Sequence, residues 1–276
     1  MRDPVIILAD NGSTRAGATL SLRRIAGRLS SVCERPVHAV SLQHVDRIPI
    51  GELDGEPALV LADFLREQLE RGRHWFVIVP LFFGSSRALS SFIPEQVRIL
   101  REQYAALRVD LAEPLVPLPQ GEPRLAAILA DNVASVGDQL DRVPDRIVLV
   151  DHGSPLPQVT AVREYLAREL ATLEPGSVVE QAVMERRTGR EYDFNGELLE
   201  EVLQRLASEG APIRVVLAML FLSPGRHAGP GGDIEEICVR AMQHHPNLQV
   251  VVTPLIGEHP RLAEILNDRL SAVLTG

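Results

Sequence analysis

The segment RIVLVDHGSP, residues 146–155, decides how the chain folds. It begins as a short apolar run rich in β-branched side chains, which is typical of a strand buried on both faces. A histidine, a glycine and a serine follow directly, so we expect a sharp turn where the strand ends. The segment VIILADNGST, residues 5–14, repeats the pattern with Asn11 in the place of His152. The two segments indicate a duplication in which one copy keeps a chemical group that the other has lost.

Other parts of the sequence are duplicated in the same order. FVIVPLFF (residues 76–83) pairs with VVLAMLFL (residues 215–222), and EPRLAAIL (residues 122–129) pairs with HPRLAEIL (residues 259–266). A period of about 140 residues is too long for a solenoid and indicates a duplicated domain. We therefore predict two domains, residues 1–142 and residues 143–276, which meet in a polar segment that contains a proline.

Both halves alternate between two kinds of pattern. Apolar runs are separated by segments whose apolar residues are spaced three or four apart, as on one face of a helix. Continuous apolar strands separated by helices indicate a parallel sheet covered on both faces. We predict an α/β fold of two duplicated domains, each a small parallel sheet with helices on both faces. Strands are expected near residues 4–10, 36–42, 75–83 and 109–116, and near residues 146–151, 177–183, 213–221 and 248–254.

The composition is that of an ordinary globular protein, since 45% of the 276 residues are hydrophobic and 24% are charged. A formal charge of −9 without a basic block argues against nucleic acid or an anionic membrane as a partner. No segment approaches the ~20 apolar residues of a membrane span, and the N-terminus lacks the order of a signal peptide. The two cysteines, Cys33 and Cys238, do not suggest a disulfide framework. We expect a cytoplasmic protein.

Three candidate metal ligands follow successive strands of the second half. His152 follows the first strand, Glu185 the second, and His227 lies in the loop after the third. Loops at the carboxyl ends of parallel strands converge, so these side chains should lie over one crevice. Two histidines and a carboxylate suit Fe²⁺, Co²⁺, Ni²⁺ or Zn²⁺, and three protein ligands leave room for an incoming partner. Taken singly, each residue also fits a simpler role in a turn or a solvated loop.

The loop that contains His227 has an unusual composition. Residues 220–237, LFLSPGRHAGPGGDIEEI, include four glycines and two prolines, so they should form a shaped irregular segment above the sheet edge. Asp233 comes directly before the next helical pattern. A carboxylate in that position commonly caps the helix and complements its dipole, which is the role we favour for Asp233.

The first half supplies an internal comparison for the metal ligands. Asn11 stands in the place of His152, and His44 is the expected counterpart of Glu185. Arg87 and Ala88 stand where the second half has the histidine-containing loop. Asparagine is a poor ligand for these metals. We therefore expect a degenerate site in the first half and a metal-competent site in the second half alone.

Together, DHGSP after a first strand, a glutamate after the second and FLSPGRHAGPGGDI after the third resemble the class II chelatases. Within them, the chain is similar to the sirohydrochlorin chelatases of cobalamin and siroheme biosynthesis, in their long form with two chelatase-like halves. The resemblance covers both halves, and the motif around His227 is its most specific part. It implies ATP-independent insertion of Co²⁺ or Fe²⁺ into a reduced tetrapyrrole held in a cleft between the halves. Asn11 departs from the pattern, because long forms can carry the active histidine there.

The resemblance also implies roles for individual residues. His152 and His227 become the metal-binding and catalytic histidines, with Glu185 as their acidic partner. The substrate carries many carboxylates, so an acidic protein needs local cations, and Arg226 and Arg186 stand beside the metal ligands. With the hydroxyl of Ser154, they are the expected substrate-binding groups. We expect the divalent metal (Co²⁺, Fe²⁺ or Ni²⁺) as a substrate, no organic cofactor, a sirohydrochlorin-type tetrapyrrole as partner, and a monomer or weak homo-oligomer.

Two other functions remain open from the sequence. A carrier that binds metal or tetrapyrrole without turnover would need the same ligands, and the degenerate first half is compatible with it. A hydrolase with Ser154 as nucleophile fits poorly, because DHGSP lacks the flanking glycines of the G-x-S-x-G elbow.

Overall fold

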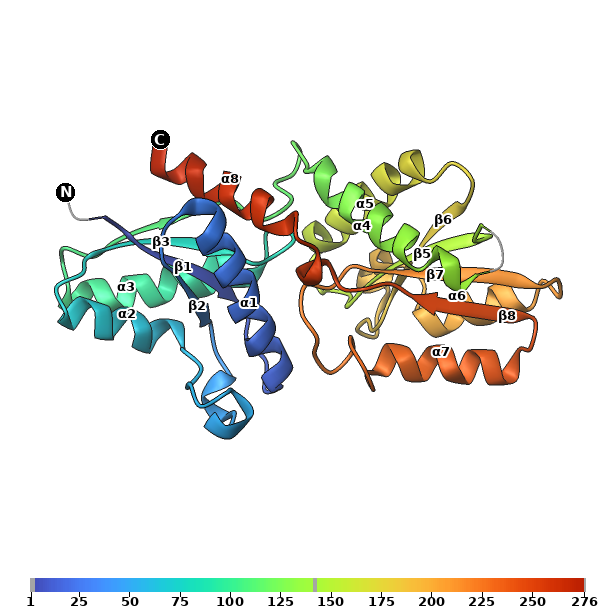
Figure 1. Cartoon of the computed structure of the whole chain (residues 1–276), viewed down its shortest axis with the longest axis horizontal. Helices are drawn as coiled ribbons and strands as arrows, with labels where there is room; N and C mark the ends of the chain where they lie inside the picture. Colours follow the sequence, from blue (N-terminus) through green and yellow to red (C-terminus); the bar gives the residue numbers. More distant parts are fainter. Residues whose placement is uncertain (1–2, 141–142, 276) are drawn as a thin grey trace. The chain divides into compact units, whose positions relative to one another are not determined.

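The computed structural model describes residues 3–140 and 143–275. In these residues strands alternate with helices and form two four-stranded parallel sheets (Figure 1). This confirms the predicted duplicated α/β fold. In spatial order the first sheet consists of β2 (Val37–Ser41), β1 (Val5–Asp10), β3 (Trp75–Pro80) and β4 (Arg108–Leu111), and the second of β6 (Val178–Val183), β5 (Arg146–Asp151), β7 (Ile213–Met219) and β8 (Leu248–Val252).

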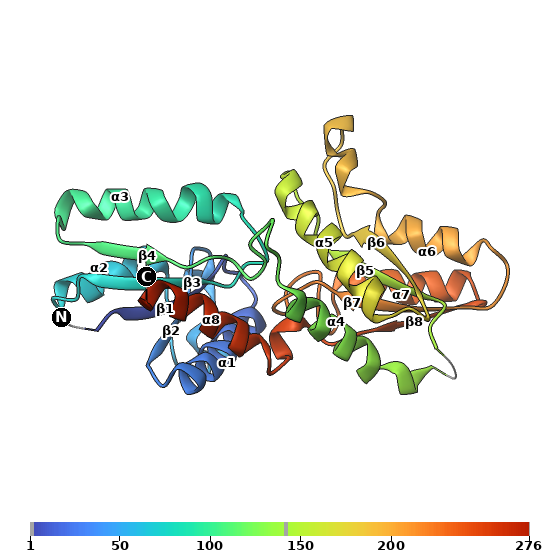
Figure 2. The same ribbon diagram turned by 90° about the horizontal axis from the view of Figure 1, so that it is seen from above.

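Helices cover both faces of the first sheet (Figure 2). Helices α2 (Leu61–Glu70) and α3 (Ile93–Gln103) share a buried apolar cluster with alternate residues of β1 and β3. The residues between them point to the opposite face, where α1 (Ala16–Cys33) and α8 (Leu262–Thr275) pack against each other. Side chains thus alternate between two apolar layers, which explains why the strands are apolar throughout.

The second sheet is built in the same way. Helices α6 (Leu199–Ala207) and α7 (Asp233–His244) share a buried cluster with alternate residues of β5 and β7. On the other face, α5 (Pro157–Leu173) packs against α4 (Pro123–Ser135). Short 3-10 turns lie at Val45–Arg47, Ile50–Glu52, Gly137–Gln139, Arg190–Asn195 and Ile256–Glu258, and a π-helical turn lies at Ala88–Phe92.

The last helix of each sequence repeat covers the sheet of the other repeat. Helix α8 packs on α1 and β3, whereas α4 packs on α5 and β7. One compact unit therefore contains the residues up to Pro117 and those from Pro260 onward, and the other contains Leu118–His259. Below, these are called the first and the second unit.

The predicted domains, residues 1–142 and 143–276, follow the sequence repeat and differ from these compact units. The predicted boundary near residue 142 lies outside the described residues. Apolar periodicity shows that a helix has a buried face, but it does not show which sheet covers that face. Leu129 of α4 and Leu266 of α8 occupy matching positions in the two repeats, and both are 0% exposed.

The strands end close to the predicted residues, except for β4. That strand stops at Leu111, although the apolar pattern predicts a strand to about residue 116. Pro114 lies in the remainder and cannot donate a hydrogen bond to a neighbouring strand. Within the described ranges, every helix is too short or too polar to cross a bilayer.

The central strand of each sheet ends in an aspartate, and the two aspartates are satisfied differently. Asp151 accepts a hydrogen bond from Arg163 Nη1 at 2.7 Å. Asp10 instead accepts bonds from Ser41 Oγ at 2.6 Å and from Gly12 N at 3.1 Å, and in the described part of the chain no cation pairs with it. Its removal from water raises the pKa of Asp10 to about 6, because these hydrogen bonds offset the lost hydration only in part.

We predict that Asp10→Asn stabilises the first unit at neutral pH. The folded-state pKa lies above the unfolded value, so the folded protein holds this proton more tightly, and stability falls as the pH rises from about 4 through about 6. Removing the carboxylate should recover roughly 1–3 kcal/mol above pH 7 and much less near pH 4. The fluorescence of Trp75, the single tryptophan of the chain and part of β3, reports denaturant unfolding of this unit.

Asp151→Asn is the matched control for this experiment. It would leave the buried Arg163 guanidinium without its anion, so the second unit should lose stability at neutral pH, as circular dichroism would measure. A gain for Asp10→Asn of equal size at pH 4 and pH 8 would contradict the prediction.

Candidate metal centre

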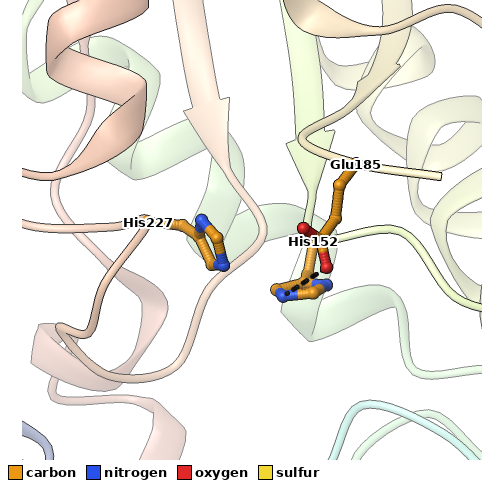
Figure 3. Close-up of side chains that lie close together, drawn as sticks. All are labelled: His152, Glu185 and His227. Carbon is orange, nitrogen blue, oxygen red and sulfur yellow. Dashed lines mark ion pairs between the residues drawn. The ribbon is translucent and has the colours of Figure 1, made fainter.

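Three side chains gather at the carboxyl edge of the second sheet (Figure 3). His152 follows β5, Glu185 follows β6, and His227 lies in the loop after β7. One ligand atom from each lies within 4.8 Å of the other two. His152 Nε2 is 3.5 Å from Glu185 Oε1, and the two imidazole rings meet edge to face with their centroids 4.7 Å apart. The three predicted ligands are therefore close enough to bind one ion.

Strand pairing brings these side chains together. The central strand β5 lies between β6 and β7, with Asp151 opposite Val183 and Val150 opposite Met219. The three strands consequently end at one level of the sheet. Side chains that are 33 and 42 residues apart in sequence thus meet over three adjacent strand ends.

A close backbone approach sets the position of His152 against Glu185. The amide of Glu185 donates to the carbonyl of His152 at 3.1 Å. Gly153 lies beneath this bond with a φ of +88°, and a Cβ at this position would lie 2.0 Å from the carbonyl oxygen of Glu185. Only a glycine adopts this turn without displacing the loop that carries Glu185.

His227 is oriented by Asp233, the first residue of α7. Nδ1 of the imidazole is 2.7 Å from Oδ2 of the carboxylate. An ionised carboxylate only accepts, so Nδ1 carries the hydrogen and the lone pair lies on Nε2. A carboxylate behind a histidine commonly selects the ring nitrogen that binds a metal. The contact with Asp233 therefore leaves Nε2 of His227 as the nitrogen available to an ion.

The predicted capping role of Asp233 is wrong. Its side chain makes no hydrogen bond to the first turn of α7. Instead the glycine-rich loop folds back on itself: the amide of Asp233 donates to the carbonyl of Arg226 at 3.2 Å, and that of Ile234 donates to His227 at 3.1 Å. This fold-back brings the carboxylate to the imidazole. A spacing of six residues carries no signal for such a contact unless the loop conformation is known.

The chemistry of the donor set indicates an exchangeable ion. Two imidazoles and one carboxylate suit borderline divalent metals, and the set has no thiolate of the kind that closes structural zinc sites. The side chains of His152 and Glu185 are 51% and 63% exposed. A bound ion would therefore remain accessible to a further ligand.

The predicted substrate-binding residues lie at the same edge but differ in availability. The side chain of Arg226 is 76% exposed, and its Nε is 3.6 Å from Asp233. Arg186 donates to the carbonyl of Gly196 at 2.9 Å, so its own loop engages part of its guanidinium. The hydroxyl of Ser154 accepts from the amide of Leu156 at 3.1 Å.

The first unit has the same backbone turn without the ligands. Asn11 follows β1. The backbone amide of Leu42 donates to the backbone carbonyl of Asp10, just as the amide of Met184 donates to the carbonyl of Asp151. This correspondence makes Gln43 the counterpart of Glu185, because the Gln43 carbonyl faces Gly12 as the Glu185 carbonyl faces Gly153.

The expected counterpart, His44, is therefore one residue out of register. It has a φ of +71° and precedes the short turn Val45–Arg47. Ala88, at the position matching His227, begins a π-helical turn instead of lying in an open loop. Among the described residues, the group of potential metal ligands lies in the second unit.

Two comparisons of the sequence with known proteins each match about half of the chain. Residues 146–273 match the family model CbiX. A curated relative, the chloroplastic sirohydrochlorin ferrochelatase of Arabidopsis thaliana, is 27% identical over 131 residues, which are 48% of this chain and 53% of the relative. The chain thus matches about half the length of that protein.

Solved structures match over almost the whole chain. SirB from Bacillus subtilis with Fe³⁺ gives a TM-score of 0.72 at 17% identity, covering 99% of this chain and 96% of that one. SirB from Bacillus subtilis subspecies spizizenii with cobalt gives 0.68 at 18% identity, covering 99% and 95%. At such low identities, these matches establish a shared fold.

We predict that Gly153→Ala weakens Co²⁺ binding. The new methyl group must displace the Glu185 backbone and thereby move the carboxylate away from His152. The positive φ adds strain of roughly 1–3 kcal/mol. Titration calorimetry with Co²⁺ alone measures the affinity.

Gly12→Ala provides the control, since its Cβ would lie 1.9 Å from the carbonyl oxygen of Gln43 in the unit without ligands. It should cost similar stability and leave the Co²⁺ affinity unchanged. Equal affinities in both variants would mean that the turn does not set the ligand geometry.

Proposed function

We propose that this protein is an ATP-independent sirohydrochlorin chelatase, because residues 146–273 match the CbiX family model. It inserts a divalent metal ion, Co²⁺ or Fe²⁺, into sirohydrochlorin. The observation that carries this proposal is the convergence of His152, Glu185 and His227 within 4.8 Å at the carboxyl edge of the second sheet. The metal is a substrate, and the reaction uses no organic cofactor.

Metal insertion makes two demands on the protein. The ion must exchange its protein ligands for the ring nitrogens, and two pyrrole protons must leave the macrocycle. Neutral imidazoles can hold the ion loosely and accept protons near neutral pH. Exposure of His152 and Glu185 lets the macrocycle approach the ion as these ligands release it. Glu185 balances the charge of the ion or takes a second proton.

Asp233 has a distinct part in this mechanism. Its hydrogen bond keeps Nδ1 of His227 occupied, so the lone pair of Nε2 would be the one available to the ion. When the ion leaves, the same carboxylate stabilises a proton on this imidazole. His227 is thereby suited to hold the metal first and a proton afterwards.

The substrate's carboxylates call for cations beside the metal ligands. Arg226 is adjacent to His227 and exposes most of its side chain, which supports a direct contact. Arg186 is committed in part to the carbonyl of Gly196, so we assign it a weaker contact, together with the loop around Ser154. The net charge of −9 supports a small molecule rather than nucleic acid as partner, and we place the reaction in the cytoplasm with a monomer or weak homo-oligomer.

We predict that His152→Ala and His227→Ala each lower metal insertion to the rate of the protein-free control. Two remaining ligands would hold the ion too weakly for transfer. Both side chains lie in loops, so unfolding free energies should change by less than about 1 kcal/mol. The absorption spectrum of sirohydrochlorin mixed with Co²⁺ or Fe²⁺ follows the reaction.

Asn11→Ala is the control in the first unit and should keep nearly the wild-type rate. A histidine variant that retains this rate would exclude that residue from the mechanism. A large loss in Asn11→Ala would show that the first unit shares the chemistry.

Glu185→Gln should be impaired less severely. The amide keeps the shape of the side chain but loses its charge, and we expect a roughly tenfold lower rate, equal to about 1.4 kcal/mol in the barrier. Steady-state kinetics at several Co²⁺ concentrations measure it. An unchanged rate would make Glu185 a solvated loop residue without a part in the reaction.

Calorimetry and the absorption assay, applied together to the wild-type protein, separate an enzyme from a carrier. Wild-type protein that binds Co²⁺ in calorimetry yet gives no metallated product above the protein-free control, with Fe²⁺ and Ni²⁺ also tried, would be a binding protein.

A further inference from the structure

A buried arginine lies behind the metal centre. Arg163 of α5 is 2% exposed, and its guanidinium is directed at three different segments. Nη1 donates to Asp151 Oδ1 at 2.7 Å, Nη2 to the carbonyl of Asn195 at 2.6 Å, and Nε to Gln181 Oε1 at 3.1 Å. A buried cation is costly unless such bonds satisfy it, and all three of its nitrogens are bonded.

Asn195 extends this network to the loop that follows His152. Its Oδ1 accepts from the amide of Ser154 at 3.0 Å, and its Nδ2 donates to the carbonyl of Ser154 at 2.9 Å. Asn195 is 1% exposed and ends the turn Arg190–Asn195, which belongs to the connection after β6. One side chain thus ties together the loops that carry His152 and Glu185.

The bonds of this network bracket His152 in the chain. Before it, Asp151 is bonded to Arg163 and also accepts from the amide of Gly153 at 3.0 Å. After it, Ser154 is held by Asn195. We infer that Arg163 is a positioning residue, which holds the His152 loop in the conformation that binds the metal.

The first unit shows what the same fold does without this arginine. Leu22 of α1 occupies the place of Arg163 in the repeat and is 1% exposed. There Ser41, opposite the terminal aspartate of the central strand, supplies the hydrogen bond, whereas Val183 stands opposite Asp151. The fold therefore forms with a leucine and a serine in these places. The arginine occurs in the unit that has the metal ligands.

The double variant Arg163→Leu/Val183→Ser rebuilds the arrangement of the first unit in the second. Asp151 would receive a hydroxyl in place of the guanidinium, so no buried charge loses its only partner. We expect a folded protein whose dissociation constant for Co²⁺ is raised roughly 10- to 100-fold, the usual effect of losing the support behind a metal ligand. Calorimetry with Co²⁺ alone measures this.

Arg163→Lys is the conservative second variant. An ammonium can reach Asp151 but cannot make three diverging bonds in one plane, so the affinity should lie between those of the double variant and the wild type. The visible spectrum of bound Co²⁺ should change in both variants, because it reports ligand geometry rather than stability.

Leu166→Ala, one turn along the same helix, separates positioning from general loss of stability. Leu166 is 0% exposed, so its truncation should lower the unfolding midpoint without touching the network. We expect wild-type Co²⁺ affinity and spectrum for this control.

Wild-type Co²⁺ affinity and spectrum in a folded double variant would overturn the inference. If the double variant does not fold, wild-type affinity and spectrum in Arg163→Lys would overturn it instead. The inference rests on the proposed function only for the identity of the metal site. Sirohydrochlorin is absent from these measurements, so a loss of Co²⁺ affinity would support the role of Arg163 even if the wild type proved unable to insert metal.

Discussion

Parallel pairing of β5 with β6 on one side and β7 on the other fixes the geometry of the candidate metal centre. It ends three strands at one level, so that His152, Glu185 and His227 meet although each belongs to a different loop. The turn at Gly153 then brings the first two loops into backbone contact. Because the ligands stand on loops above a rigid sheet, they can be exposed and still be held at short distances from one another.

The duplication offers two solutions to one problem, the aspartate at the end of a central strand. In the second unit a buried arginine neutralises Asp151 and binds the neighbouring loops. In the first unit a serine hydroxyl bonds to Asp10, and burial raises the pKa of this carboxyl to about 6. Burial raises the pKa of Asp151 as well, although the Arg163 guanidinium offsets part of that effect. The arginine of the second unit links the strand end to the loop that follows β6, whereas the hydroxyl of the first unit joins only neighbouring strand ends. Among the described residues, the candidate metal ligands lie in the unit that has the arginine.

Neither sequence repeat forms a compact unit by itself. Each sheet is covered on one face by a helix from the other repeat, α8 on the first sheet and α4 on the second. The unit that contains the candidate metal centre therefore depends on a helix encoded in the first half of the sequence. The first half contributes to this unit through α4, which buries apolar residues such as Leu125 and Leu129.

The duplication, the parallel α/β fold and the grouping of His152, Glu185 and His227 could be predicted from the sequence, because strand periodicity and the convergence of strand ends are local and topological rules. The folded structure was needed to show which sheet each terminal helix covers, that Asp233 bonds to His227 rather than capping α7, and that Gln43 rather than His44 corresponds to Glu185. These features depend on loop conformation and on the choice between equivalent apolar surfaces. The apolar face of α4 or α8 has the same pattern whichever sheet it covers. The sheet that each helix covers is therefore settled only when the chain packs.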